Sequence, residues 1–440
     1  MKKIRLILFL AISALGIGTV KAQKNSNDIR LTIEEAFDLA IKNSQKLKVV
    51  GKSEEQAKQK IEIAKLTKLP TLSTGLTYGY ISNSQIWTPS FSEHQTAEIP
   101  HNLTQFSVQA YQVIFKGGEI DNNIAKVSLE EQIAALNLKK NVTDIKFLVV
   151  AKYLDIYQLK NQVKIIEENT TLAKERLKNI NTLFKQGMVT NNDVLRTQLQ
   201  ISDLEIAYRK TNNDLIIVNQ QLNMVLGLDE SVRLEPDTSI LNNQYHLSDI
   251  DAELSDGLAN NQDLKITNTE IAIAEKNLKI IGAERYPEIA LFACNNFQRP
   301  FTNTMPAIDI YSNVWQAGLS VRYNIGSLYQ SPRKIKSGKI QVDQTREQNQ
   351  LQRQNVELDI RESYIRYNEA TANLDSYHTN LVSANENYRI VEKKYFNQLA
   401  LLTDMIDASD TKIDAEIKVS NANITVLYAY YKLLRTKGTL

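Results

Sequence analysis

Apolar residues recur at alternating spacings of three and four along the central part of the chain. From Val142 to Phe184 the spacing averages 3.5 residues over about six heptads, which is typical of a left-handed coiled coil. One helix over residues 119–185 would be roughly 100 Å long. A second seam begins at Val194, and Gly187 lies between the two seams. The pattern therefore predicts two long helices that form a hairpin with its turn near Gly187.

The same pattern occurs twice. Residues 43–70 find counterparts 217 residues later in 260–287, and residues 105–227 match 316–438 at a distance of 211. Each half therefore runs in one order, a helix, a variable segment and a long helical hairpin. The second turn is expected near residues 398–403. Because Gln398 replaces the glycine of the first turn, we expect the second turn to follow another backbone path.

The variable segments alternate apolar and polar residues with a period of two, which indicates strands. In TLSTGLTYGYIS, leucine and tyrosine share one face, while serine, threonine and glycine share the other. Each predicted strand has about ten residues, the length that a tilted membrane strand needs. The four strands are expected at about 71–82, 103–115, 288–298 and 314–326.

Four strands cannot close a barrel, and an open sheet would leave two unpaired edges in lipid. The pattern therefore predicts a barrel to which several chains contribute. Aromatic residues in these segments are candidates for the interfacial girdles of such a barrel, although a single aromatic residue in a strand is more often core. The girdle candidates are Tyr78, Tyr80, Trp315 and Tyr323.

The N-terminal segment and the composition restrict the class of protein to which the chain can belong. Residues 1–22 have the basic start, apolar run and small-residue cleavage site of a secretory signal peptide. We expect repeat 1 at 23–230, a linker at 231–246 and repeat 2 at 247–440. The chain has 52 basic and 50 acidic residues, so nothing suggests nucleic-acid binding. No apolar run after the signal approaches the roughly 20 residues of a membrane-spanning helix.

Signals of catalysis are absent from the sequence. The stretch at residues 337–340, SGKI, lacks the flanking residues of a phosphate-binding loop. The four histidines show no metal-binding spacing, and Cys294 is the only cysteine. We therefore expect no enzyme activity, no cofactor and no resident metal.

The order and duplication of these features resemble the TolC family of outer-membrane efflux proteins. The resemblance rests on the patterns Asn43-x-x-x-Leu47 and Asn260-x-x-x-Leu264 and on the first hairpin sequence, and it covers the whole mature chain. It implies a homotrimer with a 12-stranded barrel in the outer membrane and an α-helical tunnel across the periplasm. It also implies a periplasmic adaptor and an inner-membrane pump as partners.

The resemblance assigns roles to residues near the two turns. Asp404 and Asp407 would form carboxylate rings at the periplasmic entrance, whereas spacing alone favours acids that complement a helix dipole. Asp193 and Tyr395 would help to close the entrance, although Tyr395 also continues the apolar seam. The arginine that the family prototype uses for closure falls at Ala400, so closure must rest on other contacts. The tips that would dock to the adaptor are Gly187, Val189, Thr190, Gln398 and Leu401.

The leading hypothesis is a passive trimeric exit duct of an efflux or type I secretion system. The alternative is a periplasmic coiled-coil structural or adaptor protein whose strands form a soluble sandwich. The alternating faces with aromatic residues favour the duct.

Overall fold

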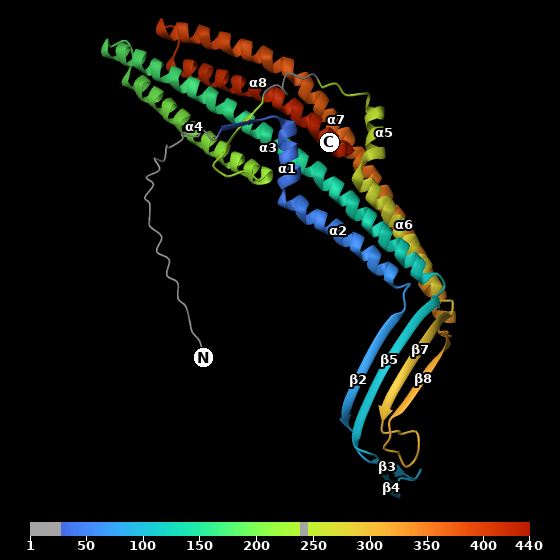
Figure 1. Cartoon of the computed structure of the whole chain (residues 1–440). Helices are drawn as coiled ribbons and strands as arrows, with labels where there is room; N and C mark the ends of the chain where they lie inside the picture. Colours follow the sequence, from blue (N-terminus) through green and yellow to red (C-terminus); the bar gives the residue numbers. More distant parts are fainter. Residues whose placement is uncertain (1–27, 238–244) are drawn as a thin grey trace, which may run out of the picture.

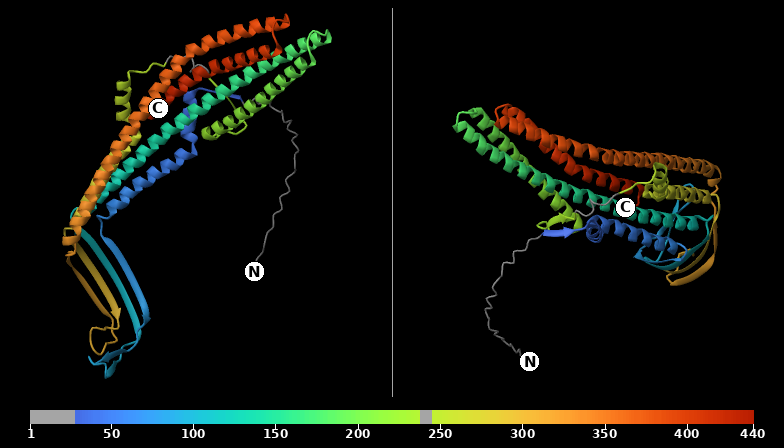
Figure 2. Two further views of the ribbon diagram at one scale, coloured as in Figure 1. Left: turned by 180° about the vertical axis from the view of Figure 1, so that it is seen from behind. Right: turned by 90° about the horizontal axis from the view of Figure 1, so that it is seen from above.

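The computed structural model describes residues 28–237 and 245–440. The predicted signal peptide and residues 238–244 of the predicted linker lie outside them. The molecule is elongated: a bundle of long helices continues at one end into a four-stranded sheet (Figure 1). At the other end the two helical hairpins turn side by side, as both views in Figure 2 show.

The predicted duplication is confirmed by the order of the elements. Each half contains two short helices where one helix was expected, two strands of the main sheet and a helical hairpin. The expected single helix is interrupted at Ser44 in the first half and at Asn261 in the second. The first half comprises α1 (Ile33–Asn43), α2 (Gln45–Leu66), β2 (Thr71–Tyr80), β5 (Asn102–Phe115), α3 (Glu119–Lys185) and α4 (Asn191–Leu226). The second comprises α5 (Ile250–Asn260), α6 (Gln262–Ala283), β7 (Glu288–Arg299), β8 (Ser312–Arg322), α7 (Ser327–Phe396) and α8 (Leu402–Lys437).

Two small sheets were not expected from the sequence. β3 (Ser84–Trp87) and β4 (His94–Ala97) form a hairpin within the connection between β2 and β5. β1 (Asp28–Leu31) pairs in parallel with β6 (Arg233–Pro236), which lies in the segment expected as a linker. All four strands have only four residues, too few to establish a period in the sequence.

The long seams produce the expected helices. α3 is continuous over 67 residues, and its buried stripe includes Ile145, Val149 and Ile156, which pack against α1 and α4. Val150 and Leu154, on another side of α3, pack against α8. The apolar positions of one helix thus join both repeats into a single bundle.

Asparagines fasten the short helices to the ends of the hairpins. The side-chain amide of Asn43 donates to the Leu226 carbonyl over 2.7 Å, at the last turn of α4. In the second half Asn261, rather than Asn260, donates to the Thr436 carbonyl over 2.9 Å. These bonds satisfy carbonyls that a helix end leaves without a partner, and they come from positions that differ by one residue between the two repeats.

The two hairpin turns follow the same path, so the expectation of a different path at Gln398 was wrong. The φ angles are 71° at Gly187 and 61° at Gln398, both in the left-handed region. The Met188 amide donates to the Leu183 carbonyl over 2.9 Å, and the Leu399 amide donates equivalently to Lys394 over 2.8 Å. The packing of the helices fixes the turn, and the glutamine accepts an unfavourable backbone conformation.

This conformation predicts opposite effects at the two turns. Gln398→Gly should stabilise the protein by up to about 1 kcal/mol, because glycine adopts the left-handed region without a Cβ clash. Gly187→Gln should destabilise it by about 1–2 kcal/mol, although its new Cβ would meet nothing within 4 Å. The midpoint of thermal unfolding of the detergent-solubilised protein would measure both. Gln398→Ala, which keeps the Cβ, is the control, and a midpoint lowered by Gln398→Gly would contradict the account.

Candidate channel entrance and sheet

The turn end of the bundle has its own apolar core. Ile180, Val194, Tyr395, Leu402 and Met405 are buried together, with side chains from α3, α4, α7 and α8. This cluster fixes the two turns next to each other. Of the predicted docking residues, Gly187, Thr190, Gln398 and Leu401 are exposed, whereas Val189 packs against the cluster.

Asp193 and Asp404 occupy equivalent positions in the first turns of α4 and α8. The Asp193 carboxylate accepts from the Thr190 amide over 2.9 Å and from its hydroxyl over 3.0 Å. The Asp404 carboxylate accepts from the Leu401 amide over 3.0 Å. Both acids therefore cap a helix and complement its dipole. Asp404 and Asp407 are also exposed. Asp404 can therefore cap its helix and still present a negative charge to the solvent.

Tyr395 is buried within the turn cluster, with 6% of its surface exposed. Its hydroxyl has no hydrogen-bond partner among the described residues. Burial raises the pKa of Tyr395 to about 12, and the nearby Asp193 carboxylate acts in the same direction. In the single chain Tyr395 packs in the seam, and its role in closure, like that of Asp193, stays a prediction.

A buried arginine that sequence reasoning missed lies near these residues. Arg176 of α3 is 5% exposed and connects all four hairpin helices. Its guanidinium donates to the Tyr388 hydroxyl over 2.8 Å, to Gln200 Oε1 over 3.0 Å and to Ser409 Oγ over 3.5 Å. Among the described residues, Arg176 forms no ion pair with a carboxylate. It is connected to two carboxylates indirectly, through hydrogen bonds of Tyr388 and Gln200.

The two relays end on acidic residues of the second repeat. Tyr388 donates to Glu392 over 2.6 Å, and Gln200 Nε2 donates to Asp410 over 3.2 Å. Loss of hydration raises the pKa of Asp410, and the negative charges of Asp407 and Asp203 act in the same direction, while Arg176 and the bond from Gln200 oppose the shift. Burial, followed by the bond to Glu392, raises the pKa of Tyr388.

A signal for Arg176 was present in the sequence. Buried positions of α3 follow the three-four spacing through Ile166, Asn169, Ala173, Arg176 and Ile180. Asparagine and arginine at seam positions are costly unless they find partners. Asn169 does so too, since its amide donates to Glu416 of α8 over 3.0 Å. Polar residues in the seam thus mark contacts between the repeats.

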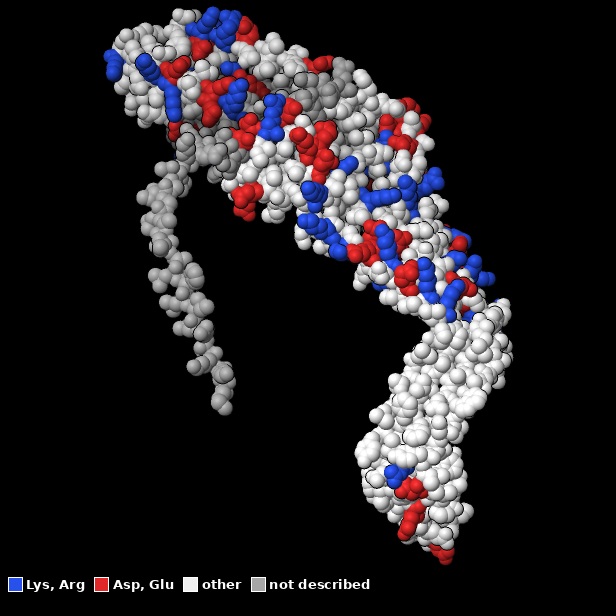
Figure 3. Space-filling model, viewed as in Figure 1, with Lys and Arg blue, Asp and Glu red and all other residues white. Residues whose placement is uncertain are grey.

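The main sheet has the strand order β2-β5-β7-β8, all antiparallel, with β2 and β8 at its edges. The register aligns polar rows on one face, such as Ser73, Gln109, Cys294 and Gln316. The opposite face carries leucine, valine and aromatic side chains, and Leu72 and Leu76 are more than 70% exposed. Charged residues cover the helices, whereas most of the sheet is uncharged (Figure 3). A large apolar surface of this kind marks an interaction site.

The girdle candidates lie on this sheet or next to it. Tyr78 and Tyr80 stand toward the loop end of β2, and Trp315 stands three residues into β8. β8 ends at Arg322, so Tyr323 follows the strand at the helical end. Their exposed fractions are 76% for Tyr78, 74% for Tyr80, 76% for Trp315 and 39% for Tyr323.

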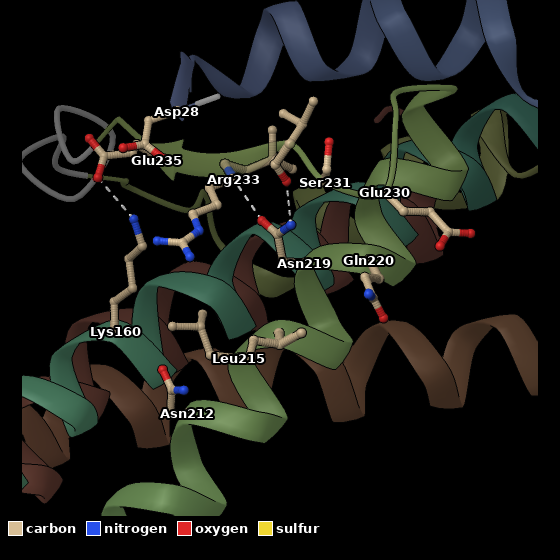
Figure 4. A pocket seen from close by; sticks show the side chains of 13 residues that line it. Asp28, Lys160, Asn212, Leu215, Asn219, Gln220, Glu230, Ser231, Arg233 and Glu235 are labelled. Carbon is tan, nitrogen blue, oxygen red and sulfur yellow. Dashed lines mark hydrogen bonds and ion pairs between the residues drawn. The ribbon is translucent and has the colours of Figure 1, made fainter. Parts of the chain in front are cut away.

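A surface pocket of about 440 Å³ lies between α3, α4 and β6 (Figure 4). Several of its polar side chains have structural partners. Asn219 binds the backbone of Val232 and Leu234 over 2.6 and 2.8 Å, and Lys160 pairs with Glu235 over 3.1 Å. The described residues contain no group of three or more side chains suited to a metal ion. Within residues 28–237 and 245–440, no helix is long and apolar enough to cross a membrane.

Comparison with known proteins identifies the class. TolC of Salmonella enteritidis is 21% identical over 458 residues, covering 100% of this chain and 87% of the relative. The outer membrane efflux protein BepC of Brucella suis biovar 1 (strain 1330) is 21% identical over 336 residues, covering 76% and 72%. The solved structure of the outer-membrane channel OprN superposes with a TM-score of 0.77 at 14% identity, covering 93% and 90%.

These relatives are outer-membrane and channel proteins rather than enzymes. The sequence profile described as "Outer membrane efflux protein" matches residues 36–228 and 254–438. The chain therefore belongs to the outer membrane efflux protein family, and the resemblance seen in the sequence is confirmed. Its function is that of an exit duct located in the outer membrane and extending into the periplasm.

The hydrogen bonds around Arg176 predict that the Tyr388 hydroxyl contributes measurably to the free energy of unfolding. Tyr388→Phe should destabilise the protein by about 1.5–3 kcal/mol, the contribution of a hydrogen bond to a charged group. Chemical unfolding in detergent would measure it, with Tyr428→Phe, at a 40% exposed tyrosine of α8, as the control. In Arg176→Met/Tyr388→Phe the two effects should not add, since the buried charge is absent. Equal midpoints for Tyr388→Phe and the control would contradict the network.

Proposed function

We propose that the chain is a passive homotrimeric duct, with a closed 12-stranded barrel in the outer membrane, that works with a periplasmic adaptor and an inner-membrane pump. The observation that carries this proposal is the open sheet with one apolar and one polar face. Its edges, β2 and β8, are unpaired with other described strands. In lipid these backbone groups must be satisfied, and closure by further copies does so.

The strand order favours a specific way of closing. β2 and β8 are the outer strands of an antiparallel sheet in which each hairpin connection joins neighbours. Pairing β8 of one copy with β2 of the next repeats the four strands around a ring. Three copies give 12 strands, an even number, with the polar rows toward the lumen and the leucine-rich face toward lipid.

The turn end supports the proposed docking of an adaptor. Leu399 and Leu401 of the second turn are 75% and 70% exposed, and Met188 of the first turn is 48% exposed. Exposed apolar side chains at the tip of a rigid hairpin are suited to bind a partner helix. The turn cluster beneath them would hold both tips in position.

A fractionation experiment tests the trimeric duct directly. The full chain should be recovered from outer membranes with detergent, and native mass spectrometry should give three times the mass of the processed chain. The apolar sheet face must be covered, so extraction without detergent should fail. Recovery as a monomer in the soluble periplasmic fraction would favour the coiled-coil adaptor and sink this proposal.

The proposed carboxylate rings make a second prediction. Asp404→Asn/Asp407→Asn should lower cation selectivity and weaken block by divalent cations in planar bilayers, because three copies would lose six negative charges. Asparagine at position 404 keeps an oxygen that can accept from the Leu401 amide. Asp375→Asn, on exposed α7 surface away from the turn, is the control. Unchanged reversal potential and block would remove both residues from the mechanism.

A further inference from the structure

Two loops lie at the end of the sheet that is farthest from the helices (Figure 1). Residues 81–101 join β2 to β5 and contain the β3–β4 hairpin, and residues 300–311 join β7 to β8. Both loops expose large apolar side chains, with exposed fractions between 40% and 75%. These are Ile86, Trp87, Phe91, Met305, Ile308, Ile310 and Tyr311.

Charged neighbours indicate that these side chains lie beyond the apolar band. Charges reappear at this end of the molecule after the uncharged sheet (Figure 3). Glu93 follows Phe91 by two residues, and Asp309 stands between Ile308 and Ile310. Lipid tails do not accommodate such acids readily. The apolar side chains of the loops therefore need a cover other than the membrane core.

Side chains of both loops make contacts within the loop or with the adjoining strand. The Arg299 guanidinium makes two hydrogen bonds to the Asp309 carboxylate, over 2.7 and 2.9 Å, and Tyr311 stacks on Phe297. In the other loop the rings of Trp87 and His94 stack with centroids 4.7 Å apart. These contacts help to hold the exposed apolar side chains of the loops in position.

Phe91 combines two unfavourable features. Its φ angle is 56°, a left-handed conformation that is a genuine outlier for a bulky residue, and its side chain is 75% exposed. Glycine or asparagine would fit this turn with less strain. The ring lies beside that of Trp87, with centroids 6.4 Å apart, but most of its surface faces solvent. A strained residue that exposes so much of an aromatic ring points to a further contact made by that ring.

We propose that the occupant is a second copy of this chain, and that the loops of neighbouring copies pack into one apolar collar around the outer mouth. This rests on the proposed trimer. Where β8 of one copy pairs with β2 of the next, loop 300–311 of the first borders loop 81–101 of the second. Each β3–β4 hairpin then lies between two 300–311 loops, one from its own copy and one from the neighbouring copy. The collar narrows the mouth and covers Phe91.

Disulfide trapping between two tagged versions of the full chain tests the collar. Both carry Cys294→Ser; one carries Phe91→Cys with one affinity tag, and the other carries Ile310→Cys with a second tag. Because no chain holds both new cysteines, a disulfide between positions 91 and 310 must join two copies. Co-expression and mild oxidation should give a heterodimer with both tags. Its yield should exceed several-fold that of the control pair Phe91→Cys with Leu399→Cys, whose positions lie at opposite ends of the molecule.

The remaining outcomes separate the collar from the trimer. Intact trimers without the heterodimer, whose position 91 reacts freely with a water-soluble maleimide, would overturn the collar and leave the duct standing. Intact trimers without the heterodimer, whose position 91 is protected, would mean that lipid or another molecule covers the loops, and would also overturn it. Absence of trimers would overturn both proposals.

Discussion

Backbone hydrogen bonding at the edges of the sheet is the constraint on which the rest of the molecule depends. Unpaired amides and carbonyls are costly in lipid, and the described chain leaves β2 and β8 with one free side each. In the proposed closed barrel, the alternation of apolar and polar rows separates the lipid side of the sheet from its lumen side. The long helices then continue the wall that the sheet begins, since each strand pair leads directly into a hairpin.

Satisfying polar groups also shapes the turn end of the bundle. Asp193 and Asp404 satisfy helix starts, and the turn cluster buries one side of every hairpin helix. Arg176 adds a polar link in the middle of this apolar packing. Arg176 is hydrogen-bonded to Tyr388 and Gln200 instead of to a carboxylate. These two side chains in turn bind Glu392 and Asp410, so the acids stay near the protein surface while the cation is buried. Displacing one hairpin from the other would expose this buried charge network.

Local patterns predicted much of this architecture. The heptad seam predicted residues 119–185 as one helix, and α3 spans Glu119–Lys185, because a periodicity that persists for roughly 12 turns is strong information. Strand alternation located the four main strands, since side chains must face either an apolar or a polar medium. Short strands such as β3 and β6 carried no such information. Their pairing depends on partners that the local sequence does not reveal.

What the sequence determined by itself is the set of long helices and main strands and their duplication, because each depends on a periodicity among residues a few positions apart. The tertiary structure decided which residues share an environment. Gln398 adopts a glycine-like backbone because packed helices leave it no alternative, and Tyr395 is buried because four helices converge on it. Arg176 finds Tyr388 and Ser409 more than 200 positions away. Such contacts arise from the way the two repeats pack, and no local periodicity encodes them.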